Sequence, residues 1–202
     1  MLSSIFNPNN GFFRFCGKLA DILMLSLLWL VCCLPIVTIG AATAALYNSA
    51  SKCVKNGENK PYVKFRDCFK ENFKAGIPVS ILVAAIAIIF SFELVTLWNG
   101  AVAGNRTAFI LLIAMAICSF VPLSYTTWIT AIFSRYEFTF PQLAVTALKF
   151  VFAHILSSFA MGVLMIAAAI LCYGFVFPLT FMPCLLAVIY SSFIEKAFKK
   201  HS

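Results

Sequence analysis

Most of this chain consists of apolar runs that are too long for the core of a small soluble domain. The run from Ile77 to Trp98 contains a single charged side chain, that of Glu93. A helix needs about 20 apolar residues to cross the ~30 Å hydrocarbon core of a bilayer. Because lipid offers the backbone no hydrogen bonds, such runs cross it as helices. The sequence therefore predicts five full membrane spans, at 19–34, 77–98, 107–133, 151–172 and 176–194.

The composition argues against a water-soluble fold. Hydrophobic residues make up 62% of the chain and charged residues 11%, against about 45–50% and about 25% in ordinary soluble domains. A surface that faces water needs more polar side chains than this chain has. We therefore expect an all-α polytopic transmembrane bundle in the cell membrane. It would form a single membrane domain over residues 1–202, with an interfacial N-terminal segment at 1–18.

A break interrupts the apolar sequence after the first predicted span, in the stretch LPIVTIGAATAALY at residues 34–47. Pro35 cannot donate the backbone hydrogen bond that a continuing helix needs. From Gly40 onward the sequence again favours a helix, and its small residues recur at a four-residue spacing that lets two helices approach closely. We expect residues 19–51 to form a broken helical hairpin, whose returning part, 36–51, either spans the membrane or is re-entrant.

The basic residues decide how this part of the chain is threaded. If residues 19–46 formed one span, Arg14, Lys18 and Arg106 would lie on the side opposite to the other basic segments. If the chain turns back at the break, all of the 15 Lys and Arg residues except Arg106 share one side. Positive charge gathers on the cytoplasmic side of membrane proteins, so both termini are predicted to be cytoplasmic. The net charge of +8 would then face anionic lipid headgroups, and no nucleic-acid partner is expected.

The largest polar segment, residues 52–75, is basic and is predicted to form a cytoplasmic amphipathic helix. Three phenylalanines recur in it at every fourth residue, each followed by a basic residue. This pattern is typical of a helix that lies on a membrane surface, and packing of the phenylalanines on the protein's own bundle is the alternative. The residues expected to contact the membrane surface or a partner are Phe65, Arg66, Phe69, Lys70, Phe73 and Lys74.

Two quoted stretches carry a family resemblance. LWLVCCLPIVTIGAATAALY (residues 28–47), followed by FRDCFKENFKAG (residues 65–76), resembles the YesL-like family of bacterial membrane proteins. Ala41 stands where many members of that family have proline. The resemblance implies a multi-pass cell-membrane protein without an established biochemical activity. It also implies an association with carbohydrate uptake systems and their regulators, beside which such proteins are often encoded.

Few polar groups inside the predicted spans are candidates for a function. Glu93 is the one acid well inside an apolar run, which makes it a functional candidate; alternatively it reaches the interface or pairs with Arg106. Pro122, which is followed closely by the four hydroxyl residues SYTT, predicts either a kink whose polar groups are satisfied locally or part of a polar pathway.

The break supplies the other candidates, Pro35, Thr38 and Gly40. They form either a broken helix that faces a substrate or partner, or a packed turn in which Thr38 caps the helix that follows.

No set of side chains in the sequence suits enzyme chemistry. It has no phosphate-binding glycine loop and no metal-ligand spacing, so no catalytic, metal or cofactor residues are predicted and the chain is not expected to be an enzyme. We prefer an accessory or regulatory component that binds a carbohydrate transporter complex. The alternative is a small transporter or channel that uses the break at Pro35–Gly40. A buried polar path joining Gly40, Glu93 and Pro122 would favour the alternative, and a dry, packed core would favour the accessory role.

Overall fold

The computed structural model describes residues 11–58, 60–136, 139–174 and 177–199. Within these ranges the ordered elements are all helical, and no strand is present. The α-helices are α1 (Gly11–Cys32), α2 (Ile39–Ser49), α3 (Pro61–Val102), α4 (Arg106–Cys118), α5 (Phe120–Phe133), α6 (Phe140–Ala153), α7 (Ile155–Gly174) and α8 (Met182–Lys199). Short 3-10 turns occur at Ile36–Thr38 and Phe177–Thr180, and α2 continues into a π-helical turn at Ala50–Lys55.

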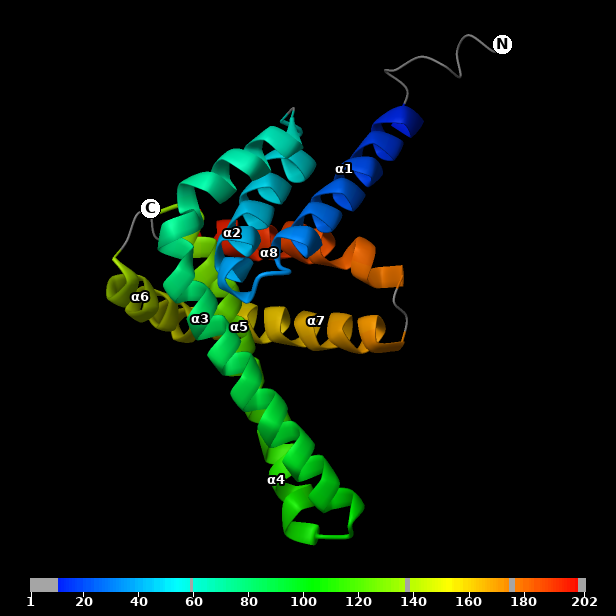
Figure 1. Ribbon diagram of the computed structural model, residues 1–202, viewed down its shortest axis with the longest axis vertical. Helices are drawn as coiled ribbons and strands as arrows, with labels where there is room; N and C mark the ends of the chain where they lie inside the picture. Colours follow the sequence, from blue (N-terminus) through cyan, green and yellow to red (C-terminus); the bar gives the residue numbers. More distant parts are fainter. Residues whose placement is uncertain (1–10, 59, 137–138, 175–176, 200–202) are drawn as a thin grey trace.

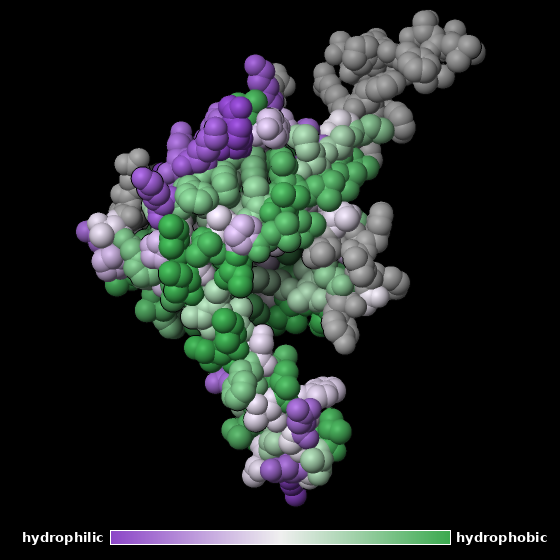
Figure 2. Space-filling model, in the orientation of Figure 1, coloured by the Kyte–Doolittle hydropathy of each residue, from purple (hydrophilic) through white to green (hydrophobic). Residues whose placement is uncertain are grey.

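Three helical stretches have the length and composition needed to cross a membrane: α3, the α4–α5 unit Arg106–Phe133, and Ile155–Cys172 in α7. Two shorter apolar helices occur at Phe140–Ala153 and Met182–Glu195. Figure 2 shows a mainly apolar surface between hydrophilic residues at the upper edge and at the lower tip of the face in view. These features define an all-helical protein of the membrane-spanning class.

The helices do not all run parallel to one another. In Figure 1, α1 descends to the break and α2 returns beside it, while α3 and α4 form a long hairpin that extends away from the other helices. Helices α7 and α8 lie side by side and run crosswise to this hairpin. The prediction of an all-α protein is confirmed, whereas the crosswise arrangement of the two helix pairs was not predicted.

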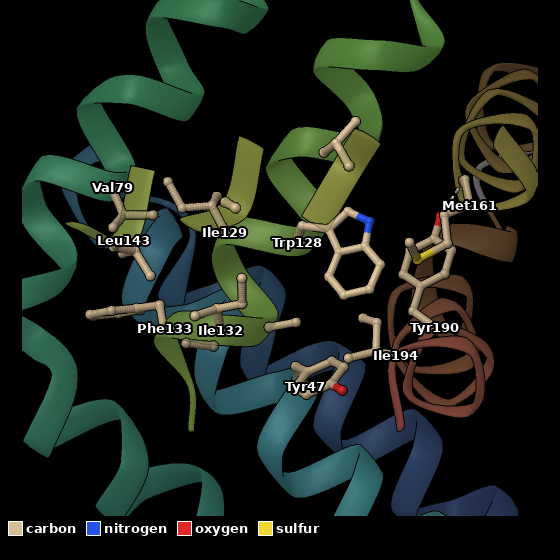
Figure 3. Close-up of a cluster of buried hydrophobic side chains, with 14 residues drawn as sticks. Tyr47, Val79, Trp128, Ile129, Ile132, Phe133, Leu143, Met161, Tyr190 and Ile194 are labelled. Carbon is tan, nitrogen blue, oxygen red and sulfur yellow. Dashed lines mark hydrogen bonds between the residues drawn. The ribbon is translucent and has the colours of Figure 1, made fainter. Parts of the chain in front are cut away.

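Helix α5 lies at the centre of the hydrophobic core. The side chains of Trp128, Ile129 and Ile132 are 0%, 0% and 1% exposed. Figure 3 shows that α2, α3, α6, α7 and α8 all contribute side chains around them. These surrounding side chains include Tyr47, Val79, Leu143, Met161, Tyr190 and Ile194.

Helix α3 joins two segments that were predicted separately. The basic segment within 52–75 and the span 77–98 form one helix from Pro61 to Val102, with Pro78 in its interior. Pro61 starts the helix, where its missing N–H costs nothing, and residues 52–58 belong to the π-helical turn and the connection after it. Pro78 therefore does not end the helix, but Figure 1 shows α3 sharply bent between its basic part and the part that forms the hairpin with α4.

The predicted span 107–133 is divided at Ser119. Helix α4 ends at Cys118 and α5 begins at Phe120, which puts Pro122 in the first turn of α5. A proline is tolerated there because the first N–H groups of a helix have no partner within it. Ser119 keeps helical backbone angles between α4 and α5, so the interruption is one residue long and falls where Pro122 offers no N–H to the Cys118 carbonyl oxygen. The predicted proline kink stays a prediction.

The chain between α5 and α7 contains a helix for which the sequence analysis made no prediction. Helix α6 begins with Pro141 in its first turn and ends at Ala153. Residues 151–153, which were assigned to the next span, complete α6, and α7 starts at Ile155.

The two outer boundaries also differ from the prediction. Residues 1–10 of the expected interfacial segment 1–18 lie outside the described residues, and from Gly11 the chain is already part of α1. The last predicted span, 176–194, starts with a 3-10 turn at Phe177–Thr180 and continues as α8 from Met182 to Lys199.

Candidate functional site

The break between α1 and α2 is a tight turn whose backbone is held by Thr38. Its hydroxyl donates to the carbonyl oxygens of Cys32 at 2.5 Å and Pro35 at 2.7 Å. The prediction that Thr38 caps the following helix is wrong, because its side chain makes no cap hydrogen bond with α2. Thr38 instead pairs with carbonyl groups at the end of α1, where helical partners are missing.

Gly40 brings α2 into backbone contact with α3. Its N–H donates to Ser80 Oγ at 2.8 Å, and the Ser80 hydroxyl donates to the Gly76 carbonyl oxygen at 2.9 Å. A Cβ on Gly40 would lie 2.7 Å from that carbonyl oxygen, and a Cβ on Gly76 would lie 2.9 Å from the Ala41 nitrogen. Close contact therefore depends on small residues in both helices. We call Gly40, Ala41, Gly76 and Ser80 the α2–α3 clasp.

The turn presents apolar side chains to its surroundings. Leu34, Ile36 and Val37 are 81%, 64% and 51% exposed, and the sequence between Asp21 and Lys52 carries no charge. Irregular backbone is tolerated at membrane depth only where its polar groups are paired. Thr38 pairs the Cys32 and Pro35 carbonyl oxygens and the clasp pairs the Gly40 N–H, so part of the backbone of the turn is satisfied within the protein.

A cavity of about 360 Å³ lies beside the clasp, bounded mainly by α2, α5, α7 and α8. Its lining includes Gly40, Thr43, Thr126 and Thr130, among mostly apolar side chains. The three threonine hydroxyls donate to carbonyl oxygens of their own helices. The lining is therefore mainly apolar and offers few polar groups that could bind a hydrophilic solute.

A polar cluster that the sequence analysis missed joins three distant segments. Glu195 accepts hydrogen bonds from Lys55 at 2.6 Å, from the Ser51 hydroxyl at 3.0 Å and from Arg135 at 3.2 Å. The Arg135 guanidinium also lies 5.6 Å from the centre of the Tyr47 ring. Desolvation acts to raise the pKa of Glu195, but the hydrogen bonds from Lys55, Ser51 and Arg135 outweigh it, and the pKa is lowered. No local sequence pattern indicates partners that are so far apart in the chain.

The hydroxyl residues after Pro122 pair with nearby backbone groups. Ser124 Oγ lies 2.6 Å from the Phe120 carbonyl oxygen and 2.5 Å from that of Ser158. Trp128 Nε1 donates to Ser158 Oγ at 3.0 Å, which connects α5 to α7. These bonds join two helices and form no path from Pro122 to Glu93 or to the break.

Glu93 lies on the α3–α4 hairpin, away from the core. It is exposed and lines an open groove of about 440 Å³ between α3 and α4. Among the described residues, no ion pair joins Glu93 to Arg106. Arg106 begins α4 at the far end of the hairpin, so the predicted alternative of a pair between these two residues is wrong.

The basic, phenylalanine-containing face of α3 was expected either to lie on the membrane surface or to pack on the bundle, and its two ends differ in burial. Phe65 is 3% exposed and packs with residues of α1 and α2, whereas Phe73 is 42% exposed. Phe69 lies between them, in ring contact with both. The remaining members of the predicted surface, Arg66, Lys70 and Lys74, are exposed. The start of this face therefore belongs to the bundle, and its end is free for other contacts.

The comparisons with known proteins concern the first half of the chain. Residues 22–94 match the model of the family described as "Protein of unknown function, DUF624". The match includes the break, the clasp, the basic face and Glu93, and it ends within α3. No curated protein and no solved structure matches the chain. Within the described residues, no group of three His, Cys, Asp or Glu side chains could hold a metal ion.

Proposed function

We propose that this protein is an accessory or regulatory component of a carbohydrate uptake system in the cell membrane, and neither an enzyme nor the conduit itself. The YesL-like resemblance supports the association with carbohydrate uptake, and the match to a family of unknown function over residues 22–94 is compatible with that resemblance. The surfaces offered to a carbohydrate transporter complex are the exposed end of the basic face and the α3–α4 hairpin.

The separation of the polar candidates is the observation that carries this proposal. Gly40 lies in the clasp, Pro122 lies at the start of α5, and Glu93 lies on the hairpin outside the core. A conduit for a hydrophilic solute needs polar groups that follow one another through the protein. Here the core is apolar, and most of its hydroxyls donate to nearby carbonyl oxygens; among the described residues, Tyr47 and Ser49 are exceptions, whose buried hydroxyls have no such partner. An accessory role needs only surfaces and a stable scaffold.

The cavity beside the clasp favours one second candidate, a small transporter. Its volume of about 360 Å³ is within the range of small-molecule sites, and it adjoins the break at Pro35–Gly40. Its dry lining restricts such a transporter to apolar solutes, which carbohydrates are not.

Co-purification and transport assays separate the two candidates. Isolated in a mild detergent, the full chain is expected to retain components of the sugar transporter encoded beside it. Purified alone in proteoliposomes, it is expected to show no solute uptake that Thr38→Ala or Glu93→Gln would abolish. Repeated isolation of the protein without any transporter component would contradict the accessory role, and uptake lost in both variants would establish the transporter.

We also propose that both termini and the basic segments face the cytoplasm. The ion pairs of Glu195 hold Lys55 and Arg135 beside the end of α8, so three basic regions share one end of the molecule. Arg106 lies at the opposite end, at the tip of the hairpin (Figure 1). In this arrangement, α1 and α2 enter and return on the cytoplasmic side, and the α3–α4 hairpin crosses the membrane, with its tip on the opposite side.

Reporter fusions test this threading. Alkaline phosphatase, which is active only outside the cytoplasm, is expected to be inactive when fused after Lys60 and active when fused after Gly104. A fusion after Leu46 tests the return of α2 and is expected to be inactive. Activity after Lys60 would overturn the proposed threading.

A further inference from the structure

The α3–α4 hairpin carries an acid for which the described residues provide no partner. Glu93 makes no hydrogen bond or ion pair with any of them, and its neighbours Phe92, Leu94 and Val95 are 74%, 52% and 58% exposed. Thr96, the other polar residue of the groove on α3, donates its hydroxyl to the Phe92 carbonyl oxygen at 2.8 Å. Glu93 is therefore the group in this groove that has hydrogen-bonding capacity left to use.

The position of Glu93 along the hairpin places it deep in the membrane. It precedes Val102, the last residue of α3, by nine positions, or about 14 Å along the helix axis. With the tip of the hairpin at one surface of a ~30 Å hydrocarbon core, Glu93 lies near the middle. An ionised carboxylate is costly at that depth unless it faces a counter-charge.

The chain itself does not provide that counter-charge among the described residues. Arg106 begins α4 eight residues before Ala114, which lines the groove, and this is about 12 Å along the helix. A second copy docked symmetrically on the same groove would bring two Glu93 carboxylates together, and like charges disfavour each other's ionised state. The groove therefore requires a different partner.

We propose that the groove between α3 and α4 binds a transmembrane helix of another protein that carries a lysine or arginine at mid-membrane depth. Such a helix would place its apolar side chains against Phe92, Leu97, Leu111 and Met115 and its cation beside Glu93. The groove, of about 440 Å³, is open along the hairpin, and α4 packs within the described chain mainly against α3 and α5. The proposal rests on the accessory role and gives the chemistry of its partner.

Cys118 provides a direct readout, because it is an exposed free cysteine that lines the same groove. The probes are synthetic leucine-rich peptides of about 21 residues, each with one central Lys, Asn or Leu and one cysteine three or four residues from it. The cysteine is placed there because Glu93 and Cys118 lie at depths that differ by only about 4–5 Å along the hairpin. The full chain and each peptide are reconstituted together in phosphatidylcholine vesicles. Disulfide formation is then catalysed, and the bond to Cys118 is quantified by mass spectrometry.

The Lys peptide is expected to cross-link to Cys118 about tenfold more efficiently than the Leu peptide. In Glu93→Gln, the cross-linking efficiency of the Lys peptide is expected to fall to that of the Leu peptide. The matched control is Val95→Gln, which adds the same amide on the other side of α3 and should leave the preference intact. The Glu93→Lys variant is expected to cross-link most efficiently to a peptide with a central Glu. That result would show that a variant at this position still folds and keeps the groove.

Equal cross-linking of the Lys and Leu peptides would overturn the proposal, as would an Asn peptide that matches the Lys peptide. Loss of the preference in Val95→Gln would also contradict it. These results would leave the accessory role standing if the transporter components still co-purify with the chain. If no transporter component co-purifies but the Lys peptide is clearly preferred, the association with carbohydrate uptake would be rejected and the proposal for the groove would stand.

Discussion

Gly40→Ala is expected to destabilise the protein by about 2 to 3 kcal/mol, because the added methyl group has no space. Its Cβ would lie 2.7 Å from the Gly76 carbonyl oxygen and 3.0 Å from the Ser80 nitrogen. Both are backbone atoms, so α2 and α3 must move apart. The apparent melting temperature in mild detergent, measured as the loss of monodisperse protein after heating, should fall by roughly 5–10 °C.

Gly17→Ala is the matched control for this substitution. Gly17 lies in α1, and a Cβ there would meet no heavy atom within 4 Å. Alanine favours a helix over glycine by about 0.8–1.0 kcal/mol, so this variant should melt at or slightly above the wild-type temperature. Gly76→Ala should behave like Gly40→Ala. Wild-type melting of both clasp variants would show that the two helices do not meet as described.

Trp128→Ala is expected to be more damaging, with a loss of about 3–5 kcal/mol. Trp128 is fully buried at the centre of the core, and its ring stacks on Phe150 with the centroids 5.2 Å apart. The substitution leaves a large cavity around α5 in the core. It also removes the indole N–H that donates a hydrogen bond to Ser158 Oγ. The same detergent assay should show a decrease of about 10 °C or more in the apparent melting temperature.

Two further tryptophan variants divide this effect into its causes. Trp98→Ala removes a ring that is 58% exposed on the hairpin, so it should change the melting temperature little. Trp128→Phe keeps one aromatic ring in the core but loses the hydrogen bond, which is worth about 1 kcal/mol, and part of the buried volume. Its loss of stability should therefore lie between those of the other two variants. A Trp128→Ala protein as stable as Trp98→Ala would contradict the central position of α5.

Local features of the sequence predicted the break correctly and its details less well. Proline, glycine and a run of small residues act on the backbone where they stand, so the turn after α1 could be predicted. The partner of Gly40 could not, because Ser80 lies 40 residues away and nothing in the local pattern selects it. Thr38 was predicted to cap the following helix, and only the path of the backbone shows that its hydroxyl instead reaches the Cys32 and Pro35 carbonyl oxygens.

Most of the errors concern segments whose sequence is compatible with more than one kind of structural element. Residues 140–153 form an apolar helix that is too short for a typical span, and beside a long apolar run only its last three residues were assigned, to the next span. The basic segment and the following span were separated at Pro78, where the structure has one helix that is continuous but bent. The Glu195 cluster was missed for a different reason: its ion-pair partners are 60 and 140 residues away.

The continuity of α3 has a mechanical consequence. Its 42 residues form two arms that meet at a sharp bend (Figure 1), and α2 contacts the helix at Gly76 and Ser80, between the basic face and the free tip. Because the helix is continuous through the bend, a displacement of the basic arm at the headgroup layer is transmitted to the arm that ends at the tip. A pivot of about 10° would carry the tip sideways by roughly 6 Å, which links events at one leaflet to the geometry at the other.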